Sequence, residues 1–182
     1  MSTLRDYLVQ KKSALLARRS AAAAAGHPTQ EISAHVTAEG RSGVRRIRIR
    51  DHQIISDSPA DFAGYDLGPS SPEIQLGVLG SCLTHIYLIK AAELDVPLDS
   101  LDIDLRAQLD PRGGLPEFPE VPVELQGISY EVQIGSPADD SRLDLLRAEV
   151  ERVCPVLNLL TKPQTITGSV VRVGAGRVPA HA

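Results

Sequence analysis

The sequence predicts an α+β fold with an antiparallel sheet, and three observations lead to this expectation. Segments with the alternating pattern of strands come in runs that few helical segments interrupt. The longest helical segment, 72–94, has apolar residues on nearly every face and therefore needs cover on all sides. The chain has 182 residues, which is enough for one domain with a hydrophobic core.

The first expected helix covers residues 4–25. Its leucines fall near one face, and the run Ala21–Ala25 has high helix propensity. Gly26 and the His27-Pro28 step end it. We expect residues 1–28 to be an extension that packs on the outside of the main domain, 29–174, or on a partner.

Three strands are expected next, over 31–38, 44–50 and 52–57. The middle one alternates strictly between a basic and an apolar face, with Arg46, Arg48 and Arg50 against Ile47 and Ile49. One basic strand face in a chain of net charge −4 does not make a nucleic-acid surface. Residues 58–71 are rich in Pro, Gly, Asp and Ser and are expected to form a loop.

The helix expected over 72–94 begins after a serine cap, Ser70 or Ser71, with Pro72 at its first position. Gly77 and Gly80 each cost about 1 kcal/mol against alanine in a helix, so they indicate close approach of another helix or backbone. A homodimer that buries two such helices together is a natural solution.

The remaining elements complete the α+β order. We expect a strand over 101–109, a loop over 111–122, and one kinked strand or a strand pair over 123–134, with the kink at Gly127. An amphipathic helix over 137–153 follows, then a short helix over 156–160 and a strand over 165–173. Residues 175–182 are expected to be a flexible tail.

Composition excludes several functional classes. No apolar run reaches the ~20 residues that a membrane helix needs, and charges near the N-terminus argue against a secretory signal. We therefore expect a cytoplasmic protein without membrane or nucleic-acid partners. The two cysteines have no C-x-x-C spacing, which argues against structural zinc, and no cofactor is expected.

The two cysteines, Cys82 and Cys154, are the candidate reactive groups. Taken alone, a cysteine in an apolar helix is more often an inert small hydrophobe, although His85 shares its helix face. Cys154 precedes a proline where a helix cap would lie, and a helix N-terminus favours a thiolate. Equally, Cys-Pro can simply mark a helix junction.

The two cysteine contexts together resemble the OsmC/Ohr family, the osmotically inducible and organic hydroperoxide resistance proteins. GPSSPEIQLGVLGSC is similar to the motif around that family's first cysteine, and CPVLN to the motif around its second. The resemblance spans residues 32–173, and the spacing of the first motif is closer to the YhfA-like branch. It implies an OsmC-like fold, with the sheet wrapped around a buried central helix in an intertwined homodimer.

The same resemblance implies a thiol peroxidase that reduces organic hydroperoxides and is recycled by a dithiol reductant, lipoyl-type or other. Cys82 would be the peroxidatic cysteine, oxidised to a sulfenic acid, and Cys154 would resolve it as a disulfide. The family's glutamate falls on Glu73 of the Pro-Glu step. Its arginine falls on Arg41 of Gly-Arg-x-Gly; the later strand positions Arg48 and Arg50 are rivals.

The spacing of Glu73 and Cys82 constrains this interpretation. Nine residues apart, they would lie on opposite sides of a continuous helix, about 13.5 Å apart along its axis. Either Glu73 lies in the turn before the helix, or the arginine and glutamate serve the cysteine of the other subunit, which we favour. A second class remains open, a small-molecule or lipid-binding module without peroxidase activity. A purely structural dimeric protein is a third.

Overall fold

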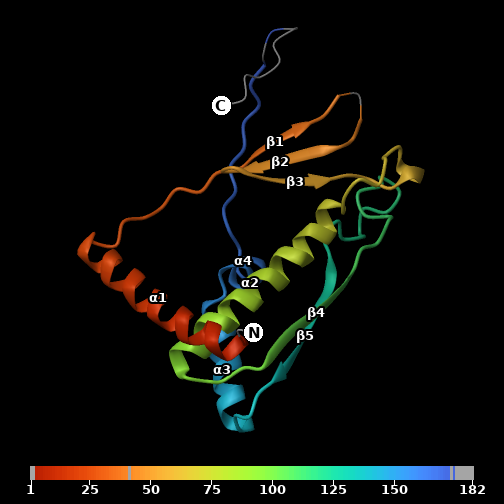
Figure 1. The fold of residues 1–182 in the computed structure, drawn as a ribbon. Helices are drawn as coiled ribbons and strands as arrows, with labels where there is room; N and C mark the ends of the chain where they lie inside the picture. The colour runs from red at the N-terminus through yellow and green to blue at the C-terminus, as the bar shows by residue number, and fades with distance from the viewer. Residues whose placement is uncertain (1–2, 41, 173, 175–182) are drawn as a thin grey trace.

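A computed structural model describes residues 3–40, 42–172 and 174 of the chain. It has the predicted α+β order of helices and antiparallel strands (Figure 1). The elements are α1 (Leu4–Ala24), β1 (His35–Ala38), β2 (Arg45–Ile49), β3 (His52–Ser56), η1 (Ala60–Phe62), α2 (Ser71–Leu94), β4 (Ser100–Gln108), β5 (Gln126–Gly135), α3 (Asp140–Val153) and α4 (Pro155–Thr161).

The strands form two separate antiparallel sheets, β1-β2-β3 and β4-β5. In the first sheet Ile47 lies opposite Val36 and Ile54, so apolar side chains form a row across the strands. Val36 and Ile54 are 56% and 41% exposed, which leaves this apolar row without full cover. Figure 1 shows the first sheet above the N-terminal half of α2, while β4 and β5 run along the helix.

Helix α2 is the centre of the fold. Ser70 caps it, as one of the two predicted serines, and the helix packs against β4, α1, α3 and α4. At Gly80 an added Cβ would lie 2.6 Å from Leu105 Cδ1, so the close approach here is made by a side chain of β4 and not by a helix or backbone as predicted. Gly77 faces open space, and Val78 is 47% exposed. The described residues of one chain therefore cover only part of the surface of this helix.

By length and mean hydropathy alone, α2 is also apolar enough to cross a membrane. Packing within the fold accounts for the buried part of this composition, 33% of the apolar stretch. Leu79, Leu83 and Tyr87 are fully buried between the second sheet and the neighbouring helices. An apolar helix is what a position at the centre of a fold requires.

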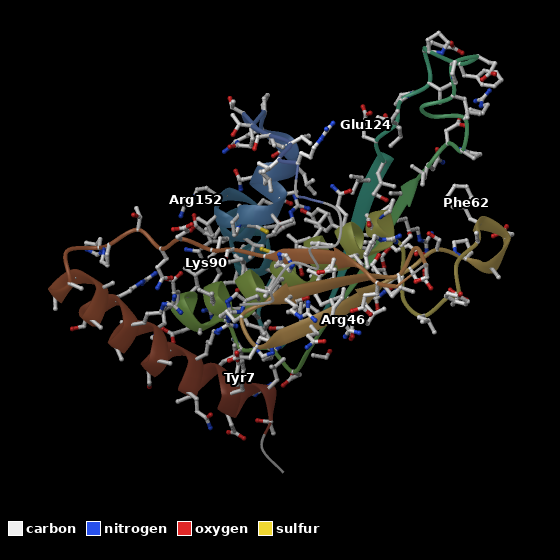
Figure 2. The ribbon with its side chains drawn as sticks, turned by 90° about the horizontal axis from the view of Figure 1, so that it is seen from above. Tyr7, Arg46, Phe62, Lys90, Glu124 and Arg152 are labelled. Carbon is white, nitrogen blue, oxygen red and sulfur yellow. The ribbon has the colours of Figure 1, made fainter. Side chains whose placement is uncertain are left out.

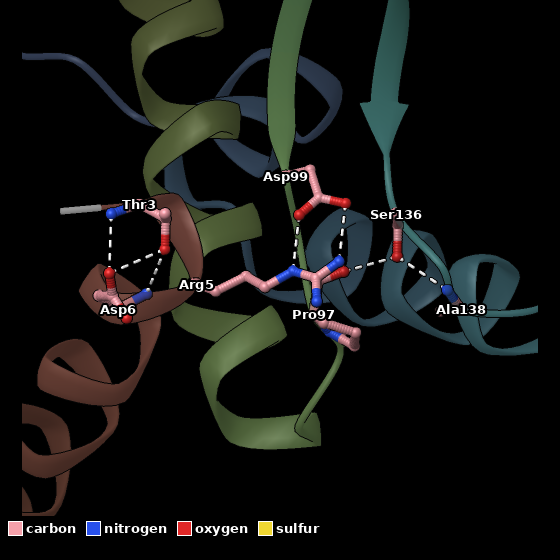
Figure 3. Close-up of polar contacts among 7 residues, drawn as sticks. All are labelled: Thr3, Arg5, Asp6, Pro97, Asp99, Ser136 and Ala138. Atoms are coloured by element: carbon pink, nitrogen blue, oxygen red, sulfur yellow. Dashed lines mark hydrogen bonds and ion pairs between the residues drawn. The ribbon is translucent and has the colours of Figure 1, made fainter. Parts of the chain in front are cut away.

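Helix α1 lies across the C-terminal half of α2. Thr3 and Asp6 form a capping box at its start (Figure 3). Leu8 is the buried residue of this helix, and at its rim Arg5 binds the carboxylate of Asp99 with bonds of 2.6 and 2.9 Å. The prediction of an N-terminal helix on the outside of the domain agrees with this placement.

Several expected elements differ from the structure. The first strand begins at His35, not at residue 31, and Arg50 follows β2 in a turn with φ +53°. The segment 123–134 gives one strand, β5, which begins at Gln126. Gly127 has φ +60°, beside a register shift between Arg106 and Gln108, and this is the predicted kink.

The strand expected over 165–173 was wrong for residues 165–172, which form no strand. Ile166 is 91% exposed and Val170 fully exposed. An alternating sequence supplies the side chains of a strand, but a strand also needs a neighbouring edge to which its backbone can hydrogen-bond. The part of the tail that the structure describes has no such neighbour within this chain.

Candidate dithiol site

The two cysteines meet in the fold although 72 residues separate them in sequence. The thiol of Cys154 donates a hydrogen bond to the sulfur of Cys82 over 3.5 Å, and both cysteines are free. A disulfide requires an S–S distance of about 2.05 Å, so the sulfurs would have to approach by about 1.5 Å. The pair is therefore close enough to form a disulfide after a small local adjustment.

The elements give the two sulfurs different surroundings. Cys82 lies in the middle of α2 and is half-buried, whereas Cys154 is fully buried. Cys154 is the last residue before the proline that starts α4, and it ends α3 with extended backbone (φ −65°, ψ 112°). One thiol is thus partly exposed and the other is enclosed.

Burial raises the pKa of the Cys154 thiol, because a thiolate is poorly solvated in apolar surroundings. The backbone N–H groups of Leu157 and Val156 act against this, while the hydrogen bond and charge of Cys82 raise the pKa further. Cys154 therefore holds its proton more firmly than an exposed cysteine and is the donor of the S–H···S hydrogen bond.

His85 is not a cationic partner for Cys82. Partial burial lowers its pKa, and the positive charges of Lys11 and Arg18 on α1 lower it further. A histidine with a pKa below its usual value is mostly neutral at pH 7. The neighbour that shares a helix face with Cys82 therefore supplies no positive charge.

Glu73 lies inside α2, in its first turn, so the turn before the helix is ruled out as its position. Its carboxylate accepts hydrogen bonds of 2.7 Å from both the backbone N–H and the hydroxyl of Ser70. These bonds close a capping box and lower the pKa of Glu73. Within one chain, Glu73 is a helix cap, nine residues along a continuous helix from Cys82.

Two of the candidate arginines, Arg48 and Arg50, belong to the first sheet and its turn. Arg41 lies outside the described residues. Arg48 lies within β2 and Arg50 just after it. The structure shows no extensive packing of this sheet on α2 within the chain, so the described part of the sheet does not place a strand arginine at Cys82. Arg46 on the same sheet, labelled in Figure 2, is held by Glu39 and Gln53.

Sequence reasoning did not anticipate a charge network beside the dithiol. Lys90 of α2 contacts Glu93 at 2.8 Å and Glu149 of α3 at 3.2 Å, and Glu149 also binds Arg152. Figure 2 shows Lys90 and Arg152 on these helices. The network ties α3, which leads to Cys154, to the helix that carries Cys82. Only the spacing of Lys90 and Glu93 on the apolar helix and of the charges on the amphipathic helix α3 could have signalled it.

Metal ligation has no candidate in the part of the chain that the structure describes. No group of three or more His, Cys, Asp or Glu side chains among these residues is arranged to hold an ion. The chemistry that the described site offers is that of two neighbouring thiols.

The fold and the site define an α+β protein with a long central helix and a pair of adjacent thiols. The sequence model of the family described as OsmC-like protein matches residues 64–168, more than half of the chain. The chain therefore belongs to the OsmC-like protein family, and the predicted OsmC-like fold is confirmed. A comparison with curated proteins gives no match.

Solved structures of the same family share this fold. An OsmC-like protein from Mycoplasma pneumoniae has a TM-score of 0.63 and 16% identity, covering 74% of this chain and 89% of its own. An organic hydroperoxide resistance protein OsmC from Legionella pneumophila has a TM-score of 0.55 and 16% identity, covering 73% and 90%. An OsmC-like protein of unknown function from Vibrio cholerae has a TM-score of 0.54 and 13% identity, covering 71% and 93%.

Proposed function

We propose that this chain is a cysteine-based thiol peroxidase that reduces organic hydroperoxides, with Cys82 as the peroxidatic and Cys154 as the resolving cysteine. The observation that carries the proposal is the 3.5 Å contact between a half-buried and a fully buried free thiol. Two thiols so placed can exchange between dithiol and disulfide, and the accessible one can meet a substrate first. The hydroperoxide-resistance name of the Legionella pneumophila relative supports the same chemistry.

The proposed cycle has three steps. The Cys82 thiolate attacks one peroxide oxygen, the O–O bond breaks, and the alkoxide leaves and takes a proton to become an alcohol. The sulfenic acid of Cys82 is then attacked by the sulfur of Cys154, and the S–S bond forms as hydroxide leaves with the Cys154 proton as water. A dithiol reductant restores both thiols by disulfide exchange. The apolar surroundings of Cys82 favour alkyl hydroperoxides over hydrogen peroxide.

The proposal includes a homodimer in the cytoplasm, in which an arginine and Glu73 of one subunit serve Cys82 of the other. The arginine is Arg41, with Arg48 or Arg50 as the rivals. Two surfaces left open in the single chain support the dimer, namely the apolar row on β1-β2-β3 and the N-terminal half of α2 around Gly77 and Val78.

The direct test follows thiol loss and cumene hydroperoxide consumption by the purified protein. The parent should lose both thiols per peroxide reduced, C82S should consume no peroxide above background, and C154S should stop at a sulfenic acid that dimedone traps. S81A is the matched control, because Ser81 is the exposed neighbour of Cys82 on the same helix. Consumption of cumene hydroperoxide by C82S at the parental rate would contradict the proposal.

Mixed dimers test the contribution of Glu73 across subunits. C82S and E73Q chains should each be inactive alone. If the glutamate acts across the interface, a mixed dimer has one complete site and should recover about half of the parental activity. If the glutamate acts within its own chain, the mixed dimer has no complete site and stays inactive, which contradicts the shared arrangement.

A second candidate function is small-molecule binding without peroxidase activity, and one observation favours it. A groove of about 450 Å³ lies between α1 and the C-terminal end of α2. It has an aliphatic lining that includes Leu8, Leu16 and Ala91, and its volume is in the range of ligand pockets. Displacement of a bound fluorescent fatty acid would test this function. C82S should leave such binding unchanged, because Ala91 is nine residues along α2 from Cys82.

A further inference from the structure

We propose that the side chain of Asn158 is a positioning residue that holds the sulfur of Cys154 against Cys82. The inference rests on the dithiol chemistry of the proposed function and adds the residue that makes the pair possible. Asn158 touches neither sulfur. Its carboxamide nitrogen lies 2.8 Å from the carbonyl oxygen of Cys154, 3.1 Å from that of Glu151 and 3.4 Å from that of Arg152.

The need for this side chain follows from Pro155. In a continuous helix, the carbonyl of Glu151 would accept a hydrogen bond from the backbone N–H four residues on, at position 155. Proline has no N–H, so that carbonyl is left without its normal donor at the end of α3. The Asn158 carboxamide supplies a replacement donor from the next helix. The same side chain thus repairs the helix end that the proline creates.

Asn158 also fixes the cysteine itself. The carbonyl of Cys154 accepts one hydrogen bond from the backbone N–H of Asn158 at 3.0 Å and a second from its side chain at 2.8 Å. Cys154 is the single residue between α3 and α4, and its extended backbone (φ −65°, ψ 112°) interrupts the helical path there. The carbonyl of Cys154 thus accepts two hydrogen bonds, and its backbone N–H donates one to the carbonyl of Val150. These three bonds fix the orientation of the Cys154 backbone.

The functional consequence of these bonds is a high effective concentration of the Cys154 thiol at the sulfur of Cys82. A buried cysteine at a loose helix junction would sample many positions, and few of them would bring its sulfur within 3.5 Å of Cys82. The carboxamide bonds remove that freedom before any oxidation takes place. We therefore assign to Asn158 the preorganisation of disulfide formation and no part in the reaction with peroxide.

The test measures the equilibrium between dithiol and disulfide in glutathione redox buffers. In this exchange Cys82 and Cys154 lose two hydrogens, which one glutathione disulfide takes up as two glutathione thiols. The equilibrium constant is the effective concentration of the two protein thiols. N158A should lower it about tenfold, the change expected from loss of one or two ordinary hydrogen bonds. N158D, of the same size but without an N–H to donate, should lower it at least as much.

T161A is the matched control. Thr161 lies on α4 and also bonds a backbone carbonyl, that of Leu157 at 2.9 Å, but it does not reach the junction at Cys154. It should leave the constant within twofold of the parent. A parental constant in N158A and N158D would overturn the proposal, and so would an equal loss in T161A, which would show a general effect of loosening α4.

A measurement on the parent protein tests the proposal even where the variants do not fold. The side-chain amide protons of Asn158 should exchange with water more slowly than those of the exposed Gln164, and exchange at equal rates would overturn the proposal. None of these readouts uses peroxide. Failure of the peroxidase function would leave the glutathione result standing, and failure of the Asn158 assignment would leave peroxide reduction untouched.

Discussion

Substitution of Leu8 by alanine should release α1 from the domain while the rest of the fold stays intact. Leu8 is 6% exposed and is the buried residue of α1. Loss of most of a buried leucine side chain costs about 2 kcal/mol, or about a thirtyfold change in an equilibrium. The other attachments include the Arg5–Asp99 and Lys12–Asp95 ion pairs, whose side chains are 39–71% exposed. Such pairs contribute about 0.2–1 kcal/mol each, which is too little to replace Leu8.

The assay is hydrogen–deuterium exchange of the α1 backbone amides in the full chain. In L8A these amides should lose about thirtyfold in protection, and addition of salt should lower the protection further, because it screens the ion pairs. L16A is the matched control, since Leu16 is a leucine on the same helix that is 57% exposed. Full protection of α1 in L8A, or equal loss in L16A, would refute the reasoning that one buried side chain docks this helix.

Three further predictions follow from the packing and the charges. G80A should lower the free energy of unfolding, measured in urea, by about 1 kcal/mol. The added Cβ would lie 2.6 Å from Leu105, and this overpacking costs more than the gain in helix propensity. A gain in stability would contradict this prediction. The pKa of Glu149 is lowered to about 2 by Arg152 and then Lys90, so its contribution to stability is present above its unfolded pKa and lost as pH falls towards 2. E149Q should therefore flatten the acid arm of a pH–stability curve, and an unchanged curve would argue against the network. The raised pKa of Cys154 means that the folded state holds this proton more tightly than the unfolded state, so stability should fall as pH rises above the usual thiol range. C154A should remove that alkaline loss, as followed by thermal unfolding between pH 8 and about 10.

The sequence was sufficient for elements that depend on local chemistry. The serine cap of α2, predicted at Ser70 or Ser71 and found at Ser70, the end of α3 before Pro155 and the kink at Gly127 follow from the conformations that these residues favour or exclude. Each of these predictions needed only a few neighbouring residues, and the structure confirms them.

Predictions that needed a distant partner were less complete. The alternation in 165–173 specifies two faces but not the strand edge that would pair with them, and residues 165–172 stay outside the sheets. The sulfur contact is the reverse case, because family resemblance implied a pairing that no local pattern could place.

The unequal burial of the two thiols gives the proposed cycle its order. A thiol with a raised pKa is mostly protonated near neutral pH and competes poorly for peroxide, which leaves the first step to the more exposed Cys82. The same Cys154 proton is needed later, because hydroxide leaving the Cys82 sulfenic acid departs more easily as water. A buried, protonated thiol 3.5 Å from the reacting sulfur is therefore slow before oxidation, and after oxidation it attacks as it passes its proton to the departing hydroxide. On this reasoning, replacing the apolar neighbours of Cys154 by polar ones would lower its pKa and weaken the distinction between the two cysteines.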